Sequence, residues 1–244
     1  MGSTVFITGS NRGIGRAILQ AFAEAGYDIV AHARQRNEDF EQSMRELSIR
    51  NQIKIRPVFF DMQNSDEMKN TIQKIIKDGV QVDVLVNNAG IAHAGLFQMT
   101  SMKTVRNVFD VNYFSHLELT QLLVRQMLKK KSGCIINIAS IAGMDFQPGN
   151  CAYGASKAAL IAWTKTLAAE VGQFGVRVNA VAPGLTDTDL AAQMGEKAKH
   201  DTMQFSAMKR LALPNEIADV VFYLATEKAS YINGQVLRVD GGLI

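Results

Sequence analysis

The strongest constraint on the fold is an alternation, along the whole chain, of short apolar runs with longer amphipathic stretches. The apolar runs are rich in β-branched residues and lie at 4–8, 28–31, 53–60, 82–86, 134–138, 176–181 and 236–239. Strands that are apolar along their whole length are typical of a parallel sheet buried on both faces. Right-handed crossovers then place helices on both faces. We therefore predict an α/β fold with a doubly wound, seven-stranded parallel sheet.

Helices are predicted between these runs. Apolar side chains recur at helical spacing in three stretches, 13–25, 102–129 and 152–171. Another helix is predicted to begin at Pro214, because proline is favoured in the first turn of a helix. Ser65 is predicted as the N-cap of a further helix, because two acids follow it directly. No stretch reads as a linker, so residues 1–244 are expected to form a single domain.

The bulk composition argues against several classes of protein. The chain has 244 residues and a formal net charge of +3, which is too small to indicate nucleic acid or an anionic membrane as a partner. Its two cysteines make no disulfide framework, and Cys134 lies in an apolar run. No secretory leader or bilayer-length apolar run is seen, so we expect a cytoplasmic protein. The scattered histidines show no paired ligand spacing, and we expect no metal site.

A glycine-rich segment joins the first predicted strand to the first predicted helix. Its glycines can reverse the chain, admit a pyrophosphate close to the backbone and pack helix on strand. The free N–H groups of the helix N-terminus then face the phosphates. The predicted phosphate-binding residues are Gly9, Ser10, Asn11, Arg12, Gly13, Ile14 and Gly15. This segment, in this context, indicates a single-domain Rossmann fold that binds a dinucleotide.

The second predicted strand ends at a basic residue. Enzymes that select NAD place an acid there to bind the ribose 2′-hydroxyl. This chain has Arg34 instead, and Arg12 adds a second cation, so a 2′-phosphate fits better. We therefore predict NADP(H) as the cofactor; the alternative is that both arginines are simply exposed. Asp61 and Met62 follow the third strand and are expected beside the adenine, unless Asp61 is only a turn acid.

Tyr153 and Lys157 stand four residues apart on a predicted helix and so share one face. The other four tyrosines have no lysine at that offset. Hydride transfer to a carbonyl carbon leaves negative charge on oxygen, which must take up a proton. A neighbouring ammonium and an oxidised nicotinamide both favour phenolate, so we expect the pKa of Tyr153 to be lowered from about 10.

Two polar residues complete the predicted catalytic set. Ser140 ends the fifth strand, where its hydroxyl can hydrogen-bond the developing oxyanion. Asn112 interrupts a long helix, where it can hold a bend and a water. Taken singly, each residue has a structural explanation: Tyr153 and Lys157 as a surface pair, Ser140 as a cap, Asn112 as a tolerated helix residue. Together, downstream of the glycine loop, they favour an oxidoreductase.

With these motifs in this order, the chain resembles the short-chain dehydrogenase/reductase family over nearly its whole length. The resemblance implies a tetrad of Asn112, Ser140, Tyr153 and Lys157. It further implies cofactor contacts from Asn88, Ala89, Gly90, Val111, Tyr153, Lys157, Pro183, Gly184, Thr186 and Thr188. It also implies a homotetramer, in which the long helices around Asn112 and Tyr153 form a four-helix bundle between subunits.

Within that family the chain is most similar to the 3-oxoacyl-acyl-carrier-protein reductases of fatty acid biosynthesis. The similarity lies in Asn-Arg-Gly-Ile-Gly of the loop, in residues 175–184 and in residues 231–242. Lysines 129–131 are then expected to meet an acidic acyl carrier protein, although they also suit an ordinary helix C-terminus. One departure is Phe174, which stands where those enzymes usually carry a docking arginine.

The sequence leaves the substrate open. The substrate lid is expected at about 188–212, where Met194, Met203, Phe205 and Met208 suit a fatty or cyclic substrate or simply fill the core. Our first hypothesis is an NADPH-dependent reductase of 3-oxoacyl thioesters. The alternatives are a reductase or dehydrogenase of another small ketone, sugar or alcohol, and a regulatory protein that binds the cofactor without turnover.

Overall fold

The computed structural model describes residues 2–145, 148–192 and 203–243. Its centre is one parallel sheet with the strand order β3-β2-β1-β4-β5-β6-β7. The strands are β1 (Thr4–Ile7), β2 (Asp28–Ala33), β3 (Ile55–Phe59), β4 (Val84–Asn87), β5 (Gly133–Ile138), β6 (Val176–Pro183) and β7 (Val236–Val239). The order reverses between β1 and β4, and this switch point is where a doubly wound fold places its ligand.

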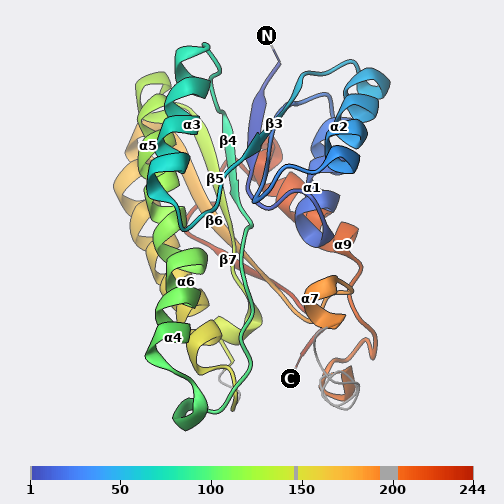
Figure 1. Ribbon diagram of the computed structural model, residues 1–244, viewed down its shortest axis with the longest axis vertical. Helices are drawn as coiled ribbons and strands as arrows, with labels where there is room; N and C mark the ends of the chain where they lie inside the picture. The colour runs from blue at the N-terminus through green and yellow to red at the C-terminus, as the bar shows by residue number, and fades with distance from the viewer. Residues whose placement is uncertain (1, 146–147, 193–202, 244) are drawn as a thin grey trace.

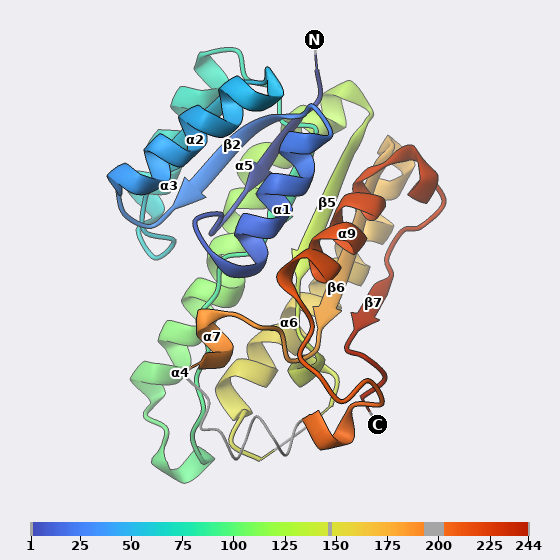
Figure 2. The ribbon, with the colours of Figure 1, turned by 90° about the vertical axis from the view of Figure 1, so that its right-hand side faces the viewer.

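Helices cover both faces of the sheet, with α3, α5 and α6 on one side and α1, α2 and α9 on the other (Figure 1). The described helices are α1 (Gly13–Glu24), α2 (Glu38–Asn51), α3 (Ser65–Lys77), α4 (Met102–Phe109), α5 (Ser115–Lys130), α6 (Cys151–Val171), α7 (Asp189–Ala192) and α9 (Pro214–Ala225). In the view of Figure 2, α1 and α9 lie side by side on their face. The predicted single-domain Rossmann fold with seven parallel strands is confirmed.

The core has two halves because successive strand residues point to opposite faces. Val5 and Ile7 of β1 belong to the half covered by α1 and α9, together with Phe22. Phe6 belongs to the other half, with Met68 of α3. Strands that are buried on both faces are the reason that β1, β4, β5 and β6 read as continuous apolar runs.

One helix was not predicted, and one helix N-cap was predicted at the wrong residue. The helix α2 was not predicted, because its three buried residues, Phe40, Met44 and Leu47, stand among charged side chains. The N-cap of α3 is Asn64 rather than Ser65: its side-chain oxygen accepts a hydrogen bond from the backbone N–H of Glu67 at 3.2 Å. Asparagine is as good an N-cap as serine, so the two neighbouring candidates could not be separated by residue type.

The long helix predicted over 102–129 is interrupted at the predicted residue. A five-residue π-helical segment, η2 (Asp110–Phe114), lies between α4 and α5 and contains Asn112. Wide turns of this kind leave the ordinary helical bonding pattern and often occur at functional sites.

No helix among the described residues is long and apolar enough to cross a membrane.

Candidate active site

A cleft of about 830 Å³ opens at the carboxyl ends of the strands, across the switch point between β1 and β4. The structure brings nearly all predicted site residues to its walls. These are Gly9, Asn11, Arg12, Gly13, Ile14, Gly15, Arg34, Asp61, Met62, Asn88, Ala89, Gly90, Val111, Ser140, Tyr153, Lys157, Pro183, Gly184, Thr186 and Thr188. Ser10 and Asn112 do not line the cleft; they lie behind it.

The glycine loop has the shape that the sequence predicts. Gly9 and Gly13 have φ values of +64° and +53°, in the left-handed region that favours glycine. A Cβ at Gly15 would overlap the carbonyl oxygen of Gly9 and the side-chain amide of Asn88. Main chain therefore packs directly on main chain, and α1 begins at the floor of the cleft with its N–H groups facing into it.

Two side chains fasten this loop to the segment after β4. The hydroxyl of Thr8 accepts hydrogen bonds from the backbone N–H groups of Asn88 and Ala89, at 2.8 and 2.9 Å. The amide of Asn88 donates back to the carbonyl oxygens of Thr8 and Gly9, at 2.9 and 3.0 Å. Thr188 closes the loop from above, since a Cβ at Gly13 would lie 3.2 Å from its methyl group.

Buried histidines support the same region, and sequence reasoning did not assign them a role. His32 of β2 accepts a hydrogen bond from the N–H of Gly9 and donates to the carbonyl of Phe60. His116 of α5 donates to the carbonyl of Ala89 at 2.7 Å. Burial lowers the pKa of His32 to about 4 and that of His116 to about 3, so both rings are neutral near pH 7. Ser10 lies beside His32 and donates its hydroxyl to the backbone of that residue.

The end of the cleft beyond β2 is basic. Arg34 is exposed at the cleft wall, and within the described residues no salt bridge engages it. Arg12 pairs with Asp189 at 3.2 Å and is also largely exposed. Arg36, which sequence reasoning missed, lines the same wall and pairs with Glu41 at 3.2 Å. Its position two residues after Arg34 was the available signal.

Asp61 and Met62 lie at the wall after β3. The carboxylate of Asp61 accepts a hydrogen bond from the N–H of Gln63 at 3.0 Å, which is the turn role considered for it. Its other oxygen takes no part in that bond, and the residue is only half-buried. Met62 is buried and packs with Phe60 in the core under the wall. Both residues line the cleft, and their contact with the adenine stays a prediction.

Tyr153, Ser140 and Lys157 meet at the opposite end of the cleft. The phenol of Tyr153 hydrogen-bonds the hydroxyl of Ser140, which stands at the end of β5. The Nζ of Lys157 lies 5.9 Å from the centre of the Tyr153 ring and donates to the carbonyl of Ile138 at 2.7 Å. The helical offset of four residues thus places both groups on one face, as predicted.

The pKa of Tyr153 moves in the direction opposite to our expectation. Burial raises it, and the hydrogen bond with Ser140 opposes that shift without cancelling it. Burial also lowers the pKa of Lys157 to about 8, because the ammonium is removed from water. The sequence shows the spacing of the two residues but not their burial, and among the protein's own groups burial dominates.

Asn112 is buried behind the wall and holds it from inside. Its side-chain oxygen accepts from the N–H of Ile91 at 2.8 Å, and its amide donates to the carbonyl of Ile91 at 2.9 Å. The amide also donates to the hydroxyl of Ser156 at 3.1 Å. Gly90 lies between Asn112 and the Nζ of Lys157, where a Cβ would approach both. Asn112 therefore ties the segment after β4 to the helix that carries Tyr153.

The remaining walls are the segment after β6, whose threonines were predicted, and loops after β4 and β5 that contain residues sequence reasoning missed. Thr186 donates its hydroxyl to the carbonyl of Gly184, and Thr188 donates to that of Thr186. His93, Asp145 and Asn150 also line the cleft. They lie in loops where no motif marks them. The lid predicted at about 188–212 falls partly outside the described residues, which resume at Met203.

Fold and site together define a dinucleotide-binding oxidoreductase. A family profile described as enoyl-(acyl carrier protein) reductase matches residues 9–244. The chain belongs to the short-chain dehydrogenase/reductase family and is an oxidoreductase of the kind that acts between CH–OH and C=O with a nicotinamide cofactor.

Three similar proteins illustrate the family. The chain is 34% identical to a 3-oxoacyl-acyl-carrier-protein reductase of Thermotoga maritima, covering 100% of this chain and 98% of that one. It is 38% identical to an acetoacetyl-CoA reductase of Acinetobacter, covering 97% and 96%. A solved 3-oxoacyl-acyl-carrier-protein reductase of Brucella melitensis with bound NAD superposes with a TM-score of 0.89 at 33% identity, covering 99% of this chain and 90% of that chain.

Proposed function

We propose that this protein reduces a 3-oxoacyl thioester to the 3-hydroxyacyl form, with NADPH as the hydride donor. The observation that carries the proposal is the arrangement of the cleft. A phosphate cradle and an exposed arginine lie at one end, and a half-buried phenol, a half-buried hydroxyl and a buried ammonium lie at the other. The catalytic roles that follow for Asn112, Ser140, Tyr153 and Lys157 are part of the proposal.

The residues present fit NADP(H). The loop from Gly9 to Gly15 lines the cleft with backbone at the N-terminus of α1, where a pyrophosphate can bind, and the close packing of Gly15 on Gly9 and Asn88 holds the loop in that shape. Arg34 and Arg12 can hold a 2′-phosphate, which an acid at the end of β2 would repel. When bound, the reduced cofactor supplies a hydride to the carbonyl carbon of the substrate.

Tyr153 is suited to give the carbonyl oxygen its proton. Because burial raises its pKa, the phenol keeps its proton near neutral pH and can release it to the oxyanion that forms. The hydroxyl of Ser140 hydrogen-bonds the phenol and lies where it can also bind that oxyanion. Lys157, with a pKa of about 8, is largely charged near pH 7 and stabilises the phenolate that is left.

The substrate class rests on the relatives. The names of the similar proteins specify 3-oxoacyl and acetoacetyl thioesters, which share a ketone β to the thioester carbonyl. An acyl carrier protein would meet the lysines at 129–131, of which Lys130 ends α5 and Lys131 is its C-cap. Phe174 lies beside them: it is half-exposed, and a Cβ on its neighbour Gly175 would overlap the carbonyl of Lys131. Because Phe174 stands in place of an arginine, this docking surface carries less positive charge than the lysines and an arginine together would give it.

The test is NADPH oxidation with acetoacetyl-CoA, with acetoacetyl-acyl carrier protein and with a panel of simple ketones and sugars. We expect turnover on the thioesters and a loss of about 1,000-fold in kcat for Tyr153→Phe. Tyr231→Phe, at a fully exposed tyrosine, is the matched control and should be unaffected. Turnover confined to simple ketones, alcohols or sugars would show that the thioester is not the substrate and would favour the alternative of a small ketone, alcohol or sugar. Tight NADPH binding without turnover on any of them would make the protein a regulatory binder.

We also propose that the protein is a homotetramer, as the family resemblance implies. Large apolar side chains are exposed on and next to α4 and η2, namely Phe97, Met99, Met102 and Phe114. An apolar surface of this kind on helices is typical of a subunit interface. Sedimentation equilibrium should give four times the mass of the chain, and Phe114→Glu should reduce it. A monomeric wild-type protein would contradict the proposal.

A further inference from the structure

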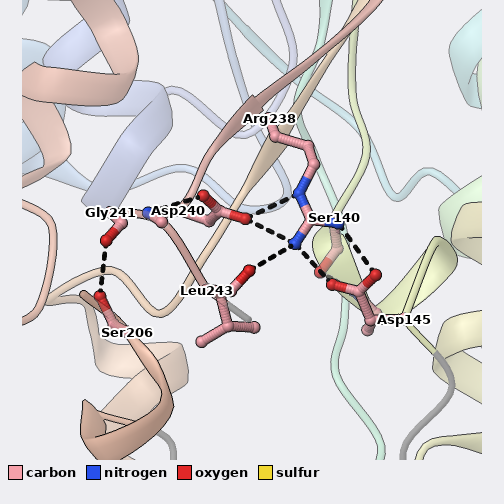
Figure 3. A network of polar contacts seen from close by, with 9 residues as sticks. Ser140, Asp145, Ser206, Arg238, Asp240, Gly241 and Leu243 are labelled. Atoms are coloured by element: carbon pink, nitrogen blue, oxygen red, sulfur yellow. Dashed lines mark hydrogen bonds and ion pairs between the residues drawn. The ribbon is translucent and has the colours of Figure 1, made fainter. Parts of the chain in front are cut away.

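Arg238 of β7 lies at the centre of a polar network near the substrate end of the cleft (Figure 3). Its guanidinium binds the carboxylate of Asp145 through two parallel hydrogen bonds, of 2.9 and 2.7 Å. It binds Asp240 through its Nε at 2.8 Å, and it also approaches the carbonyl of Leu243. The two carboxylates therefore share one cation, and only about a third of the Arg238 side chain is exposed.

Asp145 belongs to the loop that begins at Ser140. The carbonyl of Ile141 accepts a hydrogen bond from the backbone N–H of Asp145 at 2.7 Å, and the hydroxyl of Ser140 accepts from that of Ala142 at 3.1 Å. Asp145 itself lines the cleft. Hydrogen bonds thus connect the two ends of the segment 140–145, so a displacement of Asp145 should also displace Ser140.

The C-terminal segment 239–243, on the other side of Arg238, contacts the wall after β6 and the described part of the predicted lid. Ser206 donates its hydroxyl to the carbonyl of Gly241 at 3.0 Å, and the N–H of Met208 donates to the same carbonyl. Gly184, after β6, packs so closely that a Cβ there would lie 2.7 Å from the Cα of Asp240. The segment therefore contacts the lid side and the wall after β6 at once.

Arg238 is the link between these parts. Without the cation of Arg238, the carboxylates of Asp145 and Asp240 would repel each other as like charges. The ion pairs that connect the Ser140 loop to the C-terminal segment would also be lost. A planar bidentate pair fixes orientation as well as distance, which a single contact would not. The two acids hold the pKa of Arg238 above its usual value, so the cation is permanent.

We propose that Arg238 is a positioning residue for carbonyl reduction, which holds the Ser140 loop in register with the C-terminal segment and, through that segment, with the lid side. This inference rests on the proposed function. It separates the two ends of the cleft: Arg238 should affect the carbonyl substrate and leave the cofactor alone. An ordinary surface ion pair, by contrast, would contribute little to anything.

The test compares Arg238→Met with Arg56→Met. Arg56 pairs with Asp78 at 2.9 Å, with similar exposure, but far from the cleft. We expect kcat/KM for acetoacetyl-CoA to fall between about tenfold and a hundredfold in Arg238→Met, because small misplacements near the reacting groups are costly. The Kd for NADPH should stay within twofold in both variants. Arg56→Met should match the wild type.

Two further variants keep the proposal testable if Arg238→Met folds poorly. Arg238→Lys keeps the charge but not the planar fork, and should recover part of the activity. Asp145→Asn should lower kcat/KM in the same direction, and combining it with Arg238→Met should add little, since both act through one contact. Fully additive losses, or an unchanged kcat/KM in Arg238→Met, would overturn the proposal.

Amide hydrogen exchange separates this proposal from the proposed function. Residues 140–145 and 203–208 should exchange faster in Arg238→Met than in the wild type, and Arg56→Met should not change them. If the wild type fails to reduce any thioester while this exchange pattern appears, the proposed substrate is wrong and the structural link stands. If the wild type turns over and neither exchange nor kcat/KM changes, the positioning role is wrong.

Discussion

The two ends of the cleft are built in different ways. At the cofactor end, main chain packs on main chain: Gly15 admits no Cβ, and Thr8 and Asn88 exchange hydrogen bonds with backbone groups. At the substrate end, the walls are joined by side-chain charges, with Arg238 between Asp145 and Asp240. The first end depends on local geometry, and the second on contacts between distant segments.

This difference indicates which end can change without loss of the fold. A loop defined by glycine contacts tolerates little substitution, because a Cβ added at Gly9 or Gly15 meets backbone that cannot move away. Charged side chains can be exchanged with little effect on the core, and their contacts can be rebuilt in other ways. Family members can therefore share a cofactor and differ in substrate, and we expect variants at the two ends to separate accordingly.

The largest effect is expected at Lys157, where the two ends meet. Lys157→Met removes the buried ammonium beside Tyr153, and we expect kcat to fall by about 1,000-fold, as for loss of an acid–base partner. Steady-state kinetics with saturating NADPH will measure this. A variant that keeps more than a tenth of the wild-type kcat would remove Lys157 from the mechanism.

The same substitution should change how stability depends on pH. The folded chain releases the Lys157 proton near pH 8, whereas the unfolded chain holds it to about pH 10.5. Because the unfolded state binds more protons in that window, wild-type stability should rise with pH from 8 to 10.5, by about 3 kcal/mol relative to Lys157→Met. Urea unfolding of both proteins at pH 7.5, 9 and 10.5 tests this, and parallel curves would contradict the lowered pKa.

The next largest effect is expected at Gly15, in the cofactor end. Gly15→Ala should weaken NADPH binding by about 100-fold, since the new methyl group displaces the loop at an overpacking cost of about 1–3 kcal/mol. Fluorescence titration with NADPH measures the Kd. Gly2→Ala is the matched control, because its Cβ would meet only the carbonyl of Gly26 at an ordinary 3.6 Å. Equal affinities in the two variants would show that the cradle does not hold the phosphates.

The smallest effect is expected at Arg34, whose exposed side chain lines the cleft and is not part of the packed core. Arg34→Gln should raise the Kd for NADPH by about tenfold, in line with about 1.5–3 kcal/mol for a charged hydrogen bond that solvent partly screens. The Kd for NADH should not change, which makes NADH the internal control. A parallel loss with both cofactors would assign Arg34 to the fold rather than to the 2′-phosphate.

Much of the site could be predicted from the sequence because many of its determinants are close together in the chain. The segment from Gly9 to Gly15 contains its own turn geometry, and Tyr153 and Lys157 share a helix. The helix α2 was missed for the opposite reason: only Phe40, Met44 and Leu47 face the core, and that stripe is too narrow to stand out from its charged neighbours. A helix can be predicted from its apolar pattern when apolar residues are frequent on one face, and it is missed when they are few.

By itself, the sequence determined the strand order along the chain, the glycine loop and the helical spacing of Tyr153 and Lys157, because each follows from neighbours within a few residues. Only the tertiary structure decided that Arg238 meets Asp145 from 93 positions away, and that burial raises the pKa of Tyr153. Contacts between distant segments and the removal of water are properties of the packed molecule, which no short stretch of sequence contains.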